Sequence, residues 1–232
     1  MNEPLERARD AASDGDRLAA LLDAWAERPL DELVPLIERA AQRIASTPAV
    51  AARHARKADD EHAEWMATAE RGDPADLDWL LAHLVTAHGL MARERIKQLV
   101  TWPADPRFAP ALLGIARAKP LSTHRPFWTM VLQLVNRNAH HRLGPLIEPL
   151  LARKRVTTFD THLHDRLARL VRRVQTMSRL EPTAQELAVL AALTASLDRA
   201  AAGSPRKRPT TSCARSGRHP ATTACARCSP TG

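Results

Sequence analysis

The chain has 232 residues, of which 44% are apolar, and it contains no tyrosine and only three phenylalanines. Alanine and leucine make up most of the apolar fraction, which favours helices over the β-branched and aromatic residues that pack strands. The charged opening MNEPLERARD excludes a secretory signal, and no apolar run reaches the roughly 18 residues of a membrane span. We therefore expect an all-α, cytoplasmic protein that does not bind a membrane.

The formal net charge of +8 is unevenly distributed. Residues 1–202 carry 28 basic and 26 acidic residues, whereas residues 203–232 carry six basic residues and no acid. All three cysteines also lie in that last segment. The body of the chain therefore has no cysteines for a disulfide scaffold or a cysteine-ligated metal domain, and we expect neither cofactor nor metal.

Apolar residues recur at three- and four-residue spacing along most of the chain, which indicates amphipathic helices. The breaks carry helix-start chemistry, because Asp73 precedes Pro74 and Asp105 precedes Pro106, so that a carboxylate caps a helix whose first residue is proline. We expect a partly disordered lead-in over residues 1–16 and one helical domain over residues 17–202. Within that domain the pattern predicts about ten helices, at 17–27, 30–46, 58–71, 74–86, 89–101, 105–118, 125–137, 140–153, 160–178 and 183–200.

These helices pair into five hairpins whose second members look alike, namely ELVPLIERAA (32–41), DLDWLLAHLV (76–85), RFAPALLGIA (107–116), RLGPLIEPLL (142–151) and QELAVLAALT (185–194). One hairpin of this length cannot bury its apolar stripe alone, so neighbouring hairpins share a core. The loose period of about 30–45 residues predicts an α-solenoid of about five helical hairpins. The alternative is a non-repeating helical bundle.

The helix pairs resemble HEAT-type repeats. The stretches LLDAWAERP, HAEWMATAERGDPADL and WPADPRFAPALL, with STHRPFWTMVLQLV after them, resemble a group of uncharacterised proteins from GC-rich bacteria. In that group a helical region like residues 17–180 precedes a short domain with the pattern W, AxPxDD, R, YADWL. The resemblance implies a HEAT-like fold and assigns no functional residues.

The segment 203–232 reads differently and is expected to be a disordered basic tail. Its Cys213, His219, Cys225 and Cys228 lack the apolar scaffold that a structural zinc site needs, and a tail that contacts nucleic acid through phosphates is a second alternative. Back-translated with G or C at most third codon positions and read two bases later, residues 209–232 become DDELRAIWAAPGDDGLRQVLADG. That string resembles the short domain, so we interpret the tail as an out-of-frame read of a following domain.

One charge feature stands out in the helical domain. The segment 153–179 is rich in arginine, and the helix from about residue 160 combines a buried leucine stripe with arginines on its flank. The interpretation as a docking strip for an anionic partner competes with that of a solvated helix face. The candidate docking residues are Arg153, Lys154, Arg155, Arg166, Arg169 and Arg173.

No motif of the sequence predicts a defined reaction, since glycine-rich phosphate loops, G-x-S-x-G and H-E-x-x-H are all absent. We expect a non-catalytic scaffold or protein-interaction module. A nucleic-acid-binding repeat that uses the basic 153–179 face is the first alternative. The second is an enzyme resembling HEAT-fold DNA glycosylases. That enzyme requires an aspartate and two tryptophans exposed together on the concave face, and buried tryptophans would argue against it.

Overall fold

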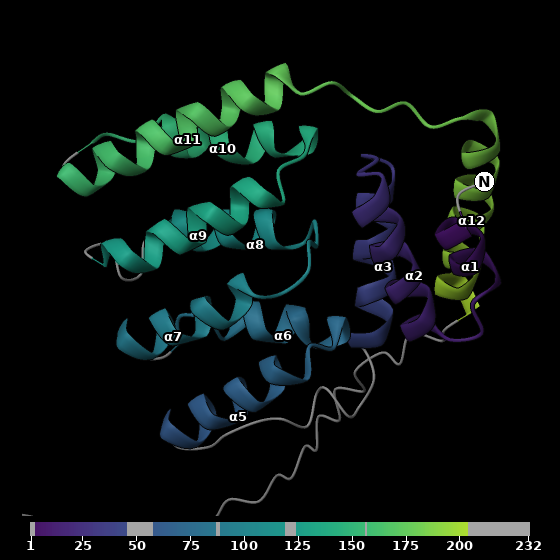
Figure 1. Cartoon of the computed structure of the whole chain (residues 1–232), viewed down its shortest axis with the longest axis horizontal. Helices are drawn as coiled ribbons and strands as arrows, with labels where there is room; N and C mark the ends of the chain where they lie inside the picture. The colour runs from purple at the N-terminus through teal and green to yellow at the C-terminus, as the bar shows by residue number, and fades with distance from the viewer. Residues whose placement is uncertain (1–2, 46–57, 87–88, 119–123, 156, 204–232) are drawn as a thin grey trace, which may run out of the picture.

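The computed structural model describes residues 3–45, 58–86, 89–118, 124–155 and 157–203 (Figure 1). These residues form eleven α-helices and two short 3-10 helices, and no strand occurs among them. The all-α prediction is therefore confirmed for the described part of the chain. The tail predicted over residues 203–232 lies outside it, apart from Gly203 at the end of the last helix.

Seven helices form a ladder of two layers that stand side by side in Figure 1. One layer holds α5 (Ala58–Arg71), α7 (Gly89–Val100), α9 (Arg125–Arg137) and α11 (Thr158–Thr176), and the other holds α6 (Leu77–Ala82), α8 (Phe108–Ala118) and α10 (Gly144–Leu151). Successive helices of each layer contact one another. A single apolar core that begins at Trp65 and ends at Val174 fills the space between the layers.

The other four helices pack into a separate cluster beside the ladder, with α1 (Glu3–Asp10), α2 (Asp14–Glu27) and α3 (Leu33–Ala45) covered by α12 (Ala184–Gly203). Leu193 and Leu197 of α12 are buried in the same core as Leu5 of α1. Two expectations are corrected here. Residues 3–10 are a packed helix rather than a loose lead-in, and the fifth hairpin does not form, because the core residues of α11 and α12 belong to different clusters.

Helix starts follow the chemistry of the sequence. The Asp73 carboxylate accepts a hydrogen bond from the Ala75 amide at 2.9 Å, and the Asp105 carboxylate accepts one from the Arg107 amide at 2.9 Å. Helix α11 begins with a capping box in which the Thr157 hydroxyl accepts a hydrogen bond from the Asp160 amide. These caps satisfy amide groups that the first turn of a helix leaves free.

Side chains near the end of one ladder helix donate hydrogen bonds to carbonyl oxygens near the end of the preceding helix in the same layer. The last turn of a helix leaves its carbonyls unpaired and favours cations, so donors from a neighbouring helix stabilise it. The residues joined are 33 to 37 positions apart. They are Trp102 with Ala69, Arg137 with Val100 and Trp102, Arg173 with Asn136, and Arg153 with Ala116 and Arg117.

The four-helix cluster meets the ladder at the short helices η1 (Pro74–Asp76) and η2 (His141–Leu143). The His141 ring lies 3.2 Å from the Asp31 carboxylate, and Arg179 forms an ion pair with Glu32 at 3.1 Å. Both contacts join the start of α3 to the far end of the ladder.

Among the described helices, none combines the length and hydropathy needed to cross a bilayer.

Candidate functional site

Helix α11 has a buried apolar stripe and an arginine-rich flank, as its sequence pattern predicts. Leu163, Leu167, Leu170 and Val174 are at most 5% exposed and belong to the ladder core, and Val171 is half-buried against it. The arginines of the flank are exposed. A helix with this pattern fixes its backbone through the core and leaves the flanking guanidinium groups available to solvent.

The flank of α11 faces α9 across a groove of about 540 Å³. Helix α11 contributes Arg166, Arg169, Leu170 and Arg173 to the groove. Helix α9 contributes Thr129, Leu132, Gln133 and Asn136. Leu132 is 9% exposed and Leu170 is 5% exposed, so the groove has an apolar floor bordered by arginines on one side and neutral polar groups on the other.

The three arginines of this groove differ in how they are held. Arg173 donates hydrogen bonds to the side chain of Asn136 at 2.7 Å and to its carbonyl at 3.2 Å. For Arg166 and Arg169 the described part of the chain offers no hydrogen bond or ion pair. Two guanidinium groups with unused donors thus lie beside a third that is anchored, which suits the binding of carboxylate or phosphate oxygens.

The other three candidate residues lie elsewhere. Arg153, Lys154 and Arg155 border a much smaller pocket at the turn between α10 and α11, together with His164. Arg153 donates to the carbonyls of Ala116 and Arg117 at the end of α8, and Arg155 lies 3.2 Å from the His164 ring. The six candidate docking residues therefore divide between the groove and this turn.

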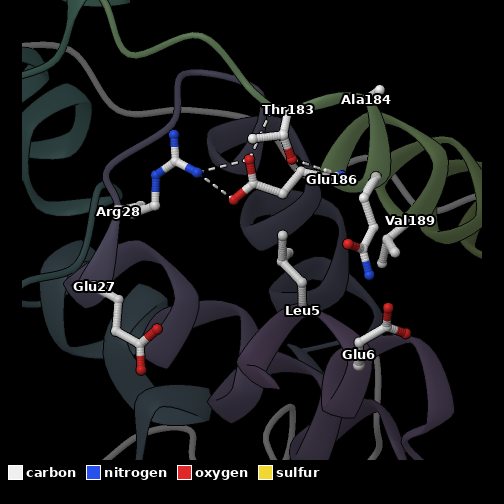
Figure 2. Close-up of a pocket in the computed structure, with 9 residues that line it drawn as sticks. Leu5, Glu6, Glu27, Arg28, Thr183, Ala184, Glu186 and Val189 are labelled. Carbon is white, nitrogen blue, oxygen red and sulfur yellow. Dashed lines mark hydrogen bonds and ion pairs between the residues drawn. The ribbon is translucent and has the colours of Figure 1, made fainter. Parts of the chain in front are cut away.

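A further pocket lies between α12 and the first two helices (Figure 2). Two of its charged groups pair with each other, since Arg28 donates to both carboxylate oxygens of Glu186 at 2.6 and 2.7 Å. Glu186 also accepts a hydrogen bond from the Thr183 amide at 2.8 Å. This ion pair fastens α12 to α2, so we assign it a structural role.

The five tryptophans are buried, with exposures from 0% for Trp65 to 8% for Trp79. Two indole N–H groups donate to backbone carbonyls, from Trp65 to Leu80 at 2.9 Å and from Trp102 to Ala69 at 3.0 Å. Core packing therefore accounts for them.

Within the described ranges, no group of three histidine, cysteine or acidic residues is arranged to hold a metal ion, and the cysteines fall outside those ranges.

Sequence reasoning identified the arginine side of the groove and missed the α9 side. Thr129, Gln133 and Asn136 recur at four- and three-residue spacing, so they share one face of α9, but an uncharged row carries no signal of its own. Their relevance depends on α9 and α11 being neighbours.

Comparisons of the chain with protein-family models, with curated proteins and with solved structures found no match.

Proposed function

We propose that the protein is a non-catalytic scaffold in which α5–α11 form a HEAT-like α-solenoid, and that the groove between α9 and α11 binds an acidic segment of a protein partner. The solenoid is supported by the side-chain bridges between successive helices, whose separations of 33 to 37 residues are close to constant. A recurring contact at a fixed spacing is what stacked repeats produce.

The observation that carries the binding function is the pair Arg166 and Arg169 beside the apolar floor of Leu132 and Leu170. Exposed arginines usually pair with acids of the same chain or lie on a polar surface, and here they border buried leucines instead. An acidic segment with one apolar side chain complements both properties, because carboxylates pair with guanidinium groups and the apolar side chain covers the leucines.

A protein partner fits this groove better than nucleic acid does. Residues 1–202 are close to electrically balanced, with 28 basic and 26 acidic residues, whereas nucleic-acid-binding domains carry a strong basic excess. The arginine set also divides between the groove and the α10–α11 turn, so it does not line one continuous phosphate track. A glycosylase-like site finds no support, because it requires exposed tryptophans and all five are buried.

The test uses fluorescence anisotropy with a labelled peptide in which glutamates surround one leucine. We expect the double variant Arg166→Glu with Arg169→Glu to weaken binding roughly tenfold or more, since a hydrogen bond to a charged group contributes about 1.5–3 kcal/mol. The matched variant Lys154→Glu with Arg155→Glu makes the same charge change at the α10–α11 turn and should keep the affinity within about twofold.

Two further peptides test whether the glutamates and the leucine of the probe each contribute to binding. A peptide with glutamines in place of the glutamates should lose binding, and one with serine in place of leucine should bind more weakly. Equal losses in the two double variants, or no binding of the acidic peptide at low salt, would refute the groove as the site. Tighter binding of a DNA duplex, lost in the groove variant alone, would replace the proposal with the nucleic-acid function.

A further inference from the structure

Helix α5 is the most acidic helix of the ladder. Its residues Ala58–Arg71 include five acids and one arginine. Asp60, Glu64 and Glu70 lie on the face turned away from the buried Trp65, and Ala63 and Ala67 lie between them on that face. Among the described residues these three carboxylates have neither an ion pair nor a hydrogen bond.

In the layer formed by α5, α7, α9 and α11, the exposed side chains change from acidic at α5 to basic at α11. Beyond the acids of α5, helix α7 exposes Glu94 and Lys97, and the α9 row in the groove is neutral. Helix α11 then exposes the groove arginines. Figure 1 shows α5 and α11 at opposite ends of the ladder, so the acidic and basic helices of one copy lie apart and cannot neutralise each other by direct contact.

The acidic face of α5 matches the groove in chemistry and in length. From Asp60 to Glu70 a helix rises about 15 Å, and from Arg166 to Arg173 it rises about 10 Å. Carboxylates on such a face can therefore reach the groove arginines along their whole length. Between these carboxylates, Ala63 and Ala67 supply the apolar contact with the floor formed by Leu132 and Leu170.

We propose that a second copy of this chain is a partner of the groove, with α5 of one molecule docked between α9 and α11 of the other. This inference rests on the proposed function, because it uses the same groove and specifies what fills it. The two contributing surfaces differ, so the contact is heterologous and leaves each molecule of a pair with one unused surface. Longer head-to-tail assemblies are therefore expected as concentration rises.

The contact is expected to be weak and sensitive to salt. A single helix in a shallow groove buries an area at the low end of specific interfaces, and its charges are at the surface. The screening length falls from about 30 Å at 0.01 M salt to about 8 Å at 0.15 M. We expect association of the full chain in low salt, and an apparent Kd at least about tenfold weaker at physiological ionic strength.

Two charge-reversal variants of the full chain test the contact by sedimentation velocity in low salt. The groove variant is Arg166→Glu with Arg169→Glu, and the helix variant is Glu64→Lys with Glu70→Lys. Each should be monomeric alone, because each lacks one of the two surfaces. Their equimolar mixture should associate again, because the unchanged helix of the first complements the unchanged groove of the second, and the two charge-reversed surfaces also carry opposite charges. The control Lys154→Glu with Arg155→Glu should associate like the unmodified chain.

The outcomes separate this inference from the proposed function. A monomeric unmodified chain at all concentrations, or a mixture of the two variants that stays monomeric, overturns self-association. If the glutamate-rich peptide still binds the groove in that case, the proposed function stands and the partner is another protein. Association that persists unchanged in both variants also overturns the α5–groove contact. Association that persists in one of the two variants also contradicts that contact, whereas loss of association in both variants, with loss of peptide binding in the groove variant alone, supports the two proposals together.

Discussion

Acidification is expected to destabilise the protein through His140, which lies where the four-helix cluster meets the ladder. The side chain is 4% exposed, and its ring stands edge-on to Trp25 with centroids 5.9 Å apart. Burial lowers the pKa of His140 to about 4. The charge of Asp31 opposes that shift, while Arg142 and His141 add to it.

The direction of the effect follows from the two protonation equilibria. In the unfolded chain His140 takes a proton near pH 6.5, whereas in the folded protein it stays neutral until about pH 4. Stability is therefore unaffected above about pH 7 and is lost as the pH falls from about 6.5 toward about 4. Between about pH 7.5 and about pH 5 the loss from this one group is about 2 kcal/mol, a sizeable share of the roughly 5–15 kcal/mol of a typical domain.

The assay is urea unfolding followed by tryptophan fluorescence at these two pH values. His140→Phe keeps an aromatic ring against Trp25 and removes the ionisable group, so its free energy of unfolding should fall about 2 kcal/mol less than that of the unmodified chain on acidification. Identical pH dependence of the His140→Phe variant and the unmodified chain would refute this account.

Three further predictions concern two ion pairs and one backbone conformation, and each is measured by urea unfolding. Asp105→Asn removes the carboxylate 2.7 Å from the guanidinium of Arg107, which is 4% exposed and keeps Asp78 at 3.5 Å, and it should cost about 3–5 kcal/mol; a cost below 1 kcal/mol would show that the pair is not needed. Glu186→Gln weakens the contact with Arg28 that fastens α12 (Figure 2), so we expect a loss of about 1–3 kcal/mol and faster proteolysis between residues 177 and 183. Gly72 has a φ of 67°, so Gly72→Ala should cost about 1–2 kcal/mol, and an unchanged midpoint would contradict that origin.

The helices of the ladder could be predicted closely because their signals are local. Apolar periodicity located helix 125–137 at the residues found in the structure, and it located 58–71 equally well. The Asp73 and Asp105 caps also depend only on adjacent residues. Helix α1 was missed for the opposite reason. Its buried side chains include Leu5 and Ala8 within a charged segment, and they are covered by helices distant in sequence.

The positions of α12 and of the arginines illustrate what periodicity cannot determine. An apolar stripe such as that of α12 packs equally well on a preceding helix or on a distant one, and the segment after Met177 is long enough to carry it to α1 and α3. Likewise, Arg153 and Arg166 are close in sequence, yet the turn before α11 separates the pockets that they line. The element that carries a residue and the direction of its side chain, rather than its distance along the chain, decide which charges share a surface.

The packing of α12 on the first three helices has a consequence for synthesis on the ribosome. Helices α1 to α3 emerge early, but the leucines of α12 that complete their core follow only after the whole ladder has been made. At typical elongation rates this delay is roughly 10–30 s. During that interval the nascent chain displays the apolar faces of α2 and α3, so the growing polypeptide needs protection from aggregation by a chaperone or by transient contacts with the ladder itself.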